Sequence, residues 1–196
     1  RDPEMSRGLG DVYKRQSTCN EALLMQYLLK NTTDSKERAV LINHFLEQFK
    51  GTLYRQTMFA EFELEINERA AKGESLTASA LCDIYRKLNE DYFGPDMEID
   101  DNIALEWARI PHFYYDYYVY QYATGFSAAI ALSDKILNEG EPAVRRYLNF
   151  LCSGCTKDPV SLLRDAGVDM SGPEPVETAL KLFNSLMDEM EELLLK

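Results

Sequence analysis

The stretch DSKERAVLINHFLEQFK, residues 34–50, indicates most directly which kind of fold this chain forms. Asp34 is a residue type that caps helix N-termini, and Glu37 three positions later completes a capping box. The apolar residues that follow recur at the spacing of one helix face: Val40, Leu41, Phe45, Leu46 and Phe49. The stretch therefore predicts an amphipathic helix that begins after Asp34 and ends near Lys50.

Similar helical patterns lie on both sides of this stretch, and glycine or proline separates most of them. The first is expected to begin at Ser17, with Ser17 or Thr18 as its N-cap, and a bend is expected near Gly51. The other predicted helices cover residues 17–31, 52–72, 77–93, 112–138, 141–151, 159–165 and 175–195. No stretch shows the alternation of a strand, so the sequence predicts an all-α fold.

A run of tyrosines between His112 and Gly125 is the most unusual feature of the composition. Half of the twelve tyrosines lie within nine positions: Tyr114, Tyr115, Tyr117, Tyr118, Tyr120 and Tyr122. A core does not need so many hydroxyls, because each buried hydroxyl must find a hydrogen-bond partner. Pro111 cannot continue a helix, so the run is expected to open a new helix, on which Tyr114 and Tyr118 share a face.

Charge and length limit the classes of function. The chain has 196 residues and a formal net charge of −12, so nucleic acid and anionic membrane surfaces are not expected as partners. No secretory signal is visible, which predicts a cytoplasmic protein with reduced cysteines. Cys152 and Cys155 have the spacing of a redox or half-zinc motif, but they lack the context of either and are interpreted as incidental.

Residues 1–16 differ from the rest of the chain. They show no apolar period and resemble translated adapter sequence, so they are interpreted as a non-native leader. The native region is then expected to be 17–196.

Five ordered segments of the chain are similar to one enzyme family. They are STCNEALL at 17–24, TLYRQTMFAEFE at 52–63, IPHFY at 110–114, YVYQYATGF at 118–126 and KDPVSLLRDAGVDM at 157–170. Together they resemble the C-terminal part of oligoendopeptidase F, a zinc metallopeptidase of the thimet oligopeptidase superfamily. The resemblance implies a multi-helix, zincin-like catalytic lobe beside a deep channel, and cytosolic hydrolysis of an oligopeptide substrate.

The resemblance also implies a zinc cofactor, whose ligands are not expected in this chain. The family holds zinc with the histidines of a His-Glu-x-x-His helix and a later glutamate. His44 and His112 are the only histidines, they lie 68 positions apart, and neither is followed by glutamate. Lys14 occupies the position of the ligating glutamate, and Glu21 is expected to border the zinc site. The chain is therefore interpreted as an inactive fragment whose further partner is the missing N-terminal part of the same enzyme.

The resemblance assigns roles to residues of the tyrosine run. His112 is implied to donate hydrogen bonds to the substrate backbone and to the oxyanion of the tetrahedral intermediate. Tyr118 and Tyr120 are predicted to act with it in catalysis, and Tyr114 to bind substrate beside it. Tyr117 is expected to supply bulk.

Two further expectations come from the residues alone. Glu61, Glu63 and Glu65 alternate around their helix and are interpreted as mostly solvated surface. A freestanding all-helical module that binds a peptide or small ligand in a tyrosine-lined cleft is the alternative function.

Overall fold

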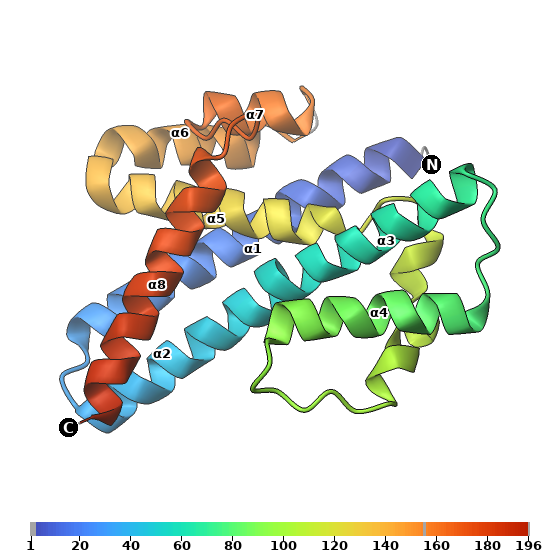
Figure 1. Cartoon of the computed structure of the whole chain (residues 1–196). Coiled ribbons are helices and arrows are strands. Elements are labelled where there is room, and N and C mark those ends of the chain that lie inside the picture. The colour runs from blue at the N-terminus through green and yellow to red at the C-terminus, as the bar shows by residue number, and fades with distance from the viewer. Residues whose placement is uncertain (1–2, 155, 196) are drawn as a thin grey trace. The chain divides into compact units, whose positions relative to one another are not determined.

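The computed structural model describes the backbone of residues 3–154 and 156–195, and side chains from residue 17 onward. The described residues form helices and no strand, as predicted (Figure 1). The elements are α1 (Pro3–Asn31), α2 (Ser35–Phe49), the π-helical turn η1 (Lys50–Tyr54), α3 (Arg55–Ala71), α4 (Ala78–Phe93), the 3-10 turns η2 (Ile103–Arg109) and η3 (Pro111–Tyr114), α5 (Tyr120–Glu139), α6 (Glu141–Cys152), α7 (Pro159–Asp165) and α8 (Glu174–Leu194).

Several helix ends follow the capping signals of the sequence. The Asp34 carboxylate accepts hydrogen bonds from the backbone N–H groups of Lys36 and Glu37, both at 3.0 Å. Thr77 caps α4 by accepting a hydrogen bond from the N–H of Ala80 at 3.2 Å. Gly94 ends α4 with φ of 76°, a conformation that glycine adopts without strain.

The predicted start of the first helix is wrong. Helix α1 begins at Pro3 and passes through Ser17 and Thr18, so neither residue is an N-cap. The Ser17 hydroxyl donates instead to the Glu21 carboxylate one turn later, at 3.1 Å. Residues 1–16 were interpreted as a non-native leader. Their side chains lie outside the described residues, so this interpretation stays a prediction.

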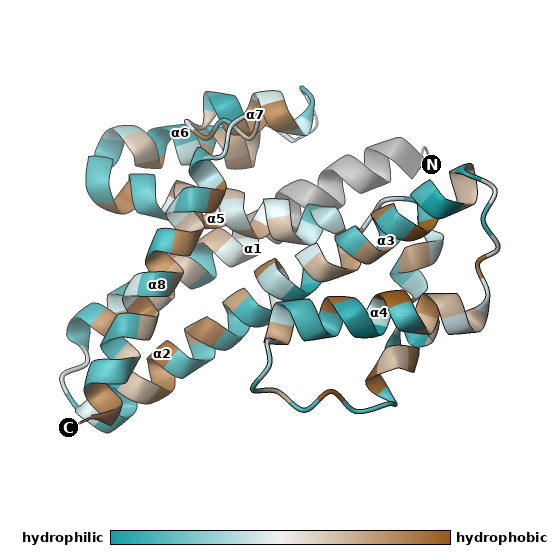
Figure 2. Cartoon of the chain, viewed as in Figure 1, coloured by the Kyte–Doolittle hydropathy of each residue, from teal (hydrophilic) through white to brown (hydrophobic). Residues whose placement is uncertain are grey.

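The chain divides into two compact units, residues 1–50 with 124–196, and residues 51–123. In the first unit, α2 packs against α1 and α8. The Phe49 ring lies 4.9 Å from that of Phe126 on α5 and 5.5 Å from that of Phe183 on α8. Helices α2 and α8 alternate hydrophobic and hydrophilic residues along their length, as amphipathic helices do (Figure 2).

A second core of this unit joins α1, α5, α6 and α7. Helix α5 supplies small residues, which allow close packing, and α6 and α7 supply larger ones. Its fully buried members include Cys19, Ala128, Ala129, Leu132, Tyr147, Phe150, Leu162 and Leu163. The Tyr147 hydroxyl donates to the Asn20 side chain at 3.1 Å. Burial raises the pKa of the Cys19 thiol to about 11, so this cysteine stays protonated.

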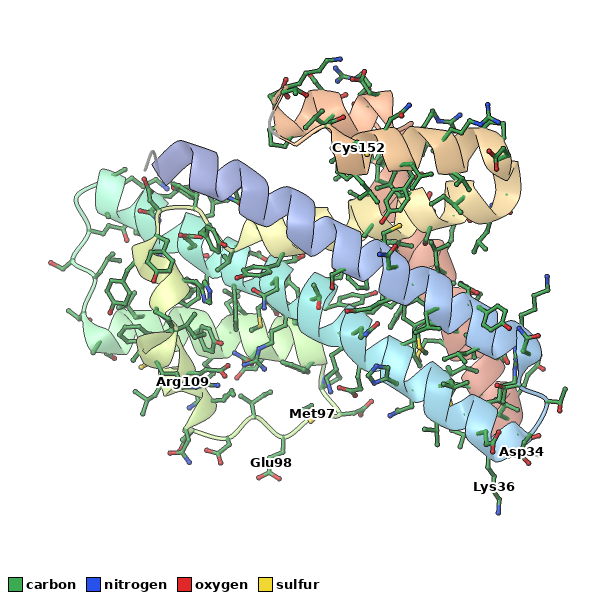
Figure 3. All side chains as sticks on the ribbon, turned by 180° about the vertical axis from the view of Figure 1, so that it is seen from behind. Asp34, Lys36, Met97, Glu98, Arg109 and Cys152 are labelled. Atoms are coloured by element: carbon green, nitrogen blue, oxygen red, sulfur yellow. The ribbon has the colours of Figure 1, made fainter. Side chains whose placement is uncertain are left out.

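The unit formed by residues 51–123 has its own aromatic core. Helix α3 packs against α4, and α4 packs against η2. The buried members are Met58, Phe59, Phe62, Ile84, Tyr85, Leu88, Ile110 and Val119. The connection from α4 to η2 runs on the surface, where Met97 and Glu98 project outward, and Arg109 lies at the end of η2 (Figure 3). This core carries the segment that contains the tyrosine run.

The predicted helix over 112–138 is wrong in its first turns. Residues 111–114 form a short 3-10 turn, residues 115–119 are not helical, and α5 begins only at Tyr120. Asp116 and Tyr117 both have φ of 52°, which a right-handed helix excludes. Tyr114 and Tyr118 therefore do not share a helical face.

The described cysteines are unpaired, and the described helices do not span a membrane. Cys19, Cys82 and Cys152 are free thiols, and Cys155 lies outside the described residues. Every helix in the described part of the chain is too short or too polar to cross a membrane.

A buried carboxylate ties η2 to both α3 and α4. Glu106 is 8% exposed and accepts hydrogen bonds from Arg55 and Arg109, and from the Tyr85 hydroxyl at 2.7 Å. Burial on its own raises the pKa of Glu106, but the Tyr85 hydroxyl and the two arginines outweigh burial and lower it. The same contact and burial raise the pKa of Tyr85, which stays neutral.

Glu106→Gln is expected to lower the free energy of unfolding by about 1.5–3 kcal/mol at neutral pH, because charge-assisted hydrogen bonds are lost. A carboxylate whose pKa is lowered in the folded state stabilises the fold above its unfolded pKa of about 4.3. That contribution is lost as the pH falls through the folded pKa. Urea unfolding between pH 7 and pH 3 is the measurement. The free energies of unfolding of wild type and Glu106→Gln should become equal at low pH.

Glu65→Gln is the matched control for this experiment. Glu65 pairs with Arg69 on the exposed face of α3 at 2.5 Å, and such pairs contribute about 0–1 kcal/mol. A difference between wild type and Glu106→Gln that stayed constant down to pH 3 would contradict the ionic contribution of Glu106.

Candidate functional site

The core of residues 51–123 anchors the tyrosine segment at two points. Ile110 before it and Val119 within it are buried among α3 and α4 side chains. Between these two anchors, the Phe113 ring packs on the rings of Phe59 and Phe62, with centroids 5.6 and 5.1 Å apart. Apolar side chains thus fix the backbone, and the polar aromatic residues between them are left for other contacts.

A turn with two left-handed residues gives the segment its shape. Asp116 and Tyr117 follow one another with φ of 52°. The left-handed conformation costs a residue with a Cβ roughly 1–2 kcal/mol, and asparagine or aspartate tolerates it better than tyrosine does. Such a conformation persists only where surrounding contacts stabilise it.

Glu63 on α3 supplies the stabilising contact, and its predicted solvent exposure is wrong. Its side chain is 2% exposed, and its carboxylate accepts a hydrogen bond from the backbone N–H of Tyr117 at 2.7 Å. Burial raises the pKa of Glu63, the backbone N–H groups of Tyr117, Tyr118 and Val119 lower it, and the charge of Asp116 raises it, with a net increase. Successive N–H groups in such a turn form a concave anion site, here filled by a side chain of the same protein.

Four rings meet beside this turn, and we call His112, Tyr115, Tyr118 and Tyr122 the aromatic cluster. The His112 ring stacks on the Tyr118 ring, with centroids 5.7 Å apart and planes 10° from parallel. Tyr115 and Tyr122 meet His112 edge to face, at 5.9 and 5.7 Å. Both also meet Tyr118 edge to face. The imidazole plane is therefore fixed on three sides by phenol rings.

His112 and Tyr122 also share a hydrogen bond. The Tyr122 hydroxyl oxygen lies 3.3 Å from His112 Nε2, and the direction of donation depends on the imidazole tautomer. When Nε2 carries the proton it donates to the hydroxyl. When Nε2 is unprotonated it accepts from the hydroxyl, and Nδ1 becomes the protonated nitrogen. The pair can thus change which of its atoms donates without moving either ring.

The structure brings together two of the four residues predicted for the site. His112 and Tyr118 are stacked in the aromatic cluster. Tyr114, on η3, is 78% exposed, and Tyr120 is 49% exposed at the start of α5. Tyr115 and Tyr122 were missed, because their place beside His112 follows from the turn and not from helical spacing. The roles of all these residues stay predictions.

The described residues do not form a metal site by themselves. No group of three histidine, cysteine, aspartate or glutamate side chains is placed to hold a metal ion within the part of the chain whose side chains are described. The Lys14 side chain lies outside that part. Glu21 is exposed on α1 and accepts the hydrogen bond from Ser17.

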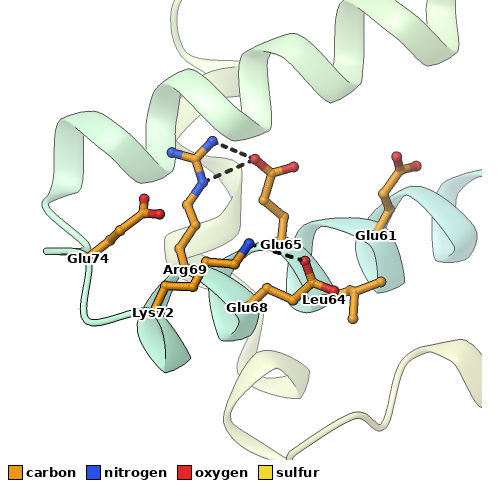
Figure 4. A pocket seen from close by; sticks show the side chains of 7 residues that line it. All are labelled: Glu61, Leu64, Glu65, Glu68, Arg69, Lys72 and Glu74. Atoms are coloured by element: carbon orange, nitrogen blue, oxygen red, sulfur yellow. Dashed lines mark hydrogen bonds and ion pairs between the residues drawn. The ribbon is translucent and has the colours of Figure 1, made fainter.

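An open groove of about 550 Å³ runs along the outer face of α3 (Figure 4). It is lined by charged residues and one leucine: Glu61, Leu64, Glu65, Glu68, Arg69, Lys72 and Glu74. Arg69 and Lys72 pair with glutamates one turn earlier on the same helix. Such pairing is typical of a solvated helix face, so the aromatic cluster is the stronger candidate for a functional site.

Known proteins match this chain along most of its length. The model of peptidase family M3 matches residues 11–182. Oligopeptidase PepF of Bacillus subtilis (strain 168) is 59% identical over 180 residues, which cover 92% of this chain and 27% of that protein. The chromosomal oligoendopeptidase F of Lactococcus lactis subsp. cremoris is 44% identical over 180 residues, which cover 92% of this chain and 30% of that protein.

Solved structures give the same result. The crystal structure of oligoendopeptidase-F from Enterococcus faecium superposes with a TM-score of 0.92 and 46% identity, over 97% of this chain and 36% of that one. A putative peptidase from Chlamydophila abortus superposes with a TM-score of 0.83 and 40% identity, over 90% of this chain and 30% of that one.

The chain thus spans less than a third of the length of these two curated relatives. The resemblance to oligoendopeptidase F that the sequence suggested is confirmed. This chain belongs to peptidase family M3.

Proposed function

We propose that this chain forms the peptide-binding wall of an oligopeptidase, and that His112 and Tyr118 hydrogen-bond the substrate backbone during hydrolysis. The observation that carries the proposal is the fixed stack of His112 on Tyr118, flanked by two further tyrosines, in a chain of peptidase family M3. The substrate would be a short peptide and the setting the cytoplasm. In this proposal, zinc is held by residues outside the described part of the chain.

The chemistry of the cluster suits a peptide bond that is being attacked. A tetrahedral intermediate carries negative charge on the former carbonyl oxygen, and donors that are already in place stabilise it without reorganisation. Imidazole N–H and phenol O–H groups are such donors. Because rings and not flexible chains carry these donors, few side-chain rotations must be frozen when the substrate binds.

The other predicted residues take lesser places in this proposal. Tyr114, being largely exposed, is suited to contact substrate residues away from the reacting bond. Tyr120 lies at the first position of α5, just beyond the buried Val119. Its proposed role is a second hydroxyl donor, which is separable from that of Tyr118 by substitution.

The chain on its own is expected to bind no stoichiometric zinc and to leave a quenched oligopeptide uncleaved. The physical reason is that its described side chains offer no three-ligand cluster. Metal content after dialysis against zinc and fluorescence release from the peptide are the two measurements. Stoichiometric zinc together with turnover would contradict the proposal. Tight binding of peptide without any need for a longer protein would favour the freestanding module.

Tyr118→Phe, made in an intact enzyme that contains this chain, is expected to lower kcat on the order of 10²-fold with little change in KM. A donor that acts mainly in the transition state affects turnover more than ground-state binding. Tyr92→Phe is the matched control, because it removes a hydroxyl that donates to Glu61 at 2.9 Å outside the aromatic cluster. Equal changes in kcat and KM for Tyr118→Phe would indicate uniform binding instead.

A further inference from the structure

We propose that Glu63 is a positioning residue of the peptide-binding site, whose buried carboxylate holds the left-handed turn at Asp116 and Tyr117 and thereby sets the aromatic cluster. This inference rests on the function proposed above, but it concerns a residue on a different helix. Glu63 itself contacts the turn backbone and is placed to act through it.

The turn lies in the middle of the sequence segment that supplies the aromatic cluster. Asp116 and Tyr117 lie between Tyr115 and Tyr118 in the sequence, and those two rings meet edge to face at 5.9 Å. In an extended segment, residues three positions apart lie roughly 10 Å apart along the chain. The reversal at the two left-handed residues brings the rings together, and both rings then contact His112.

The turn conformation costs free energy that a contact must offset. Two consecutive left-handed residues that carry side chains are unfavourable, and tyrosine has no side-chain oxygen near its backbone to compensate. The anchors Ile110 and Val119 fix where the segment begins and ends but not the conformation between them. The contact from Glu63 to the Tyr117 N–H at 2.7 Å acts on the strained residue itself.

The residue that contacts the turn is an acid, Glu63. A buried carboxylate is costly unless donors surround it, and the N–H groups of Tyr117, Tyr118 and Val119 all favour its charge. The Tyr117 N–H, on the second left-handed residue, reaches the carboxylate at 2.7 Å. The acid and the turn conformation therefore stabilise each other, and loss of one is expected to release the other.

Glu63→Gln in this 196-residue chain tests the proposal by NMR. The chain has only two histidines, and His44 on α2 belongs to the other unit, so it serves as a reference in the same spectrum. The ring-current shifts of His112 from Tyr118 are expected to decrease while the His44 signals stay unchanged. Exchange of the Tyr117 amide hydrogen should speed up about tenfold, because the Gln amide oxygen still accepts from this N–H but lacks the charge that strengthens the bond.

Glu61→Gln is the matched control, because Glu61 lies on the same helix and accepts a hydrogen bond from Tyr92 away from the turn. It should leave the His112 shifts and the Tyr117 exchange rate unchanged. Unchanged His112 shifts and Tyr117 exchange in Glu63→Gln would overturn the proposal.

A second pair of variants keeps the test decisive if Glu63→Gln does not fold. Asp116→Gly and Asp116→Ala both remove an exposed carboxylate, but only glycine adopts a positive φ without strain. Asp116→Gly should keep the His112 ring-current shifts and Asp116→Ala should reduce them. Equal shifts in the two variants would mean that the turn does not set the rings, which would overturn the proposal.

Binding of a fluorescein-labelled peptide of Ala, Gly and Ser to a zinc-depleted intact enzyme that contains this chain separates this proposal from the function on which it rests. Such a peptide offers backbone carbonyls and little else, so its affinity should fall about tenfold in Glu63→Gln, as for loss of a well-placed hydrogen bond. If the wild-type enzyme binds no peptide while Glu63→Gln in the 196-residue chain shows the expected NMR changes, the proposed function is contradicted and the positioning role is still supported.

Discussion

The carboxylate of Glu63 and the backbone N–H groups of the tyrosine turn depend on each other. Glu63 is 2% exposed, and a charge buried to that extent would be expelled or neutralised if no donors faced it. A turn with two left-handed residues would relax if no acceptor drew its N–H groups together. Helix α3 and the loop before α5 are thus joined by a polar contact inside an apolar core, and the orientation of the aromatic cluster depends on that contact.

The same unit contains a second buried carboxylate, which has a different kind of hydrogen-bond partner. Glu106 meets two arginines and a tyrosine hydroxyl, so side chains from α3, α4 and η2 compensate its charge. The donors that face Glu63 are backbone N–H groups instead, and they lower its pKa without outweighing burial. Side-chain partners tie elements together, whereas backbone partners also specify local conformation. This difference explains why Glu106 serves the packing of the unit while Glu63 serves the shape of a loop.

Capping signals and apolar periods were enough to predict most of the helices. Asp34, Thr77 and Gly94 lie at helix ends for local reasons that a sequence displays, and the all-α class follows from them. The first helix was placed too late because Ser17 and Thr18 have the chemistry of caps, and only the backbone before them reveals that they lie inside a helix.

The site was only partly predictable, again because the local sequence did not show the surrounding backbone. The tyrosine run contains no glycine or proline before Gly125, so its sequence is compatible with a helix and gives no sign of a left-handed turn. The turn depends on Glu63, which lies more than fifty positions earlier among glutamates of similar spacing. Local patterns cannot distinguish the one glutamate that meets a loop from neighbours that meet water. The resemblance to a family had named His112 and Tyr118, which the structure stacks on each other, and their roles stay predictions.

The π-helical turn at Lys50–Tyr54 has a consequence for the register of the chain. The backbone is helical from Ser35 to Ala71, yet the two ends of this span belong to different compact units. A π turn holds roughly one residue more than an α turn, and each residue rotates a helix by about 100°. Phe49 before this turn packs in the core of one unit, and Phe59 after it packs in the core of the other. The chain therefore passes from one core to the other along a continuously helical backbone, without an intervening loop.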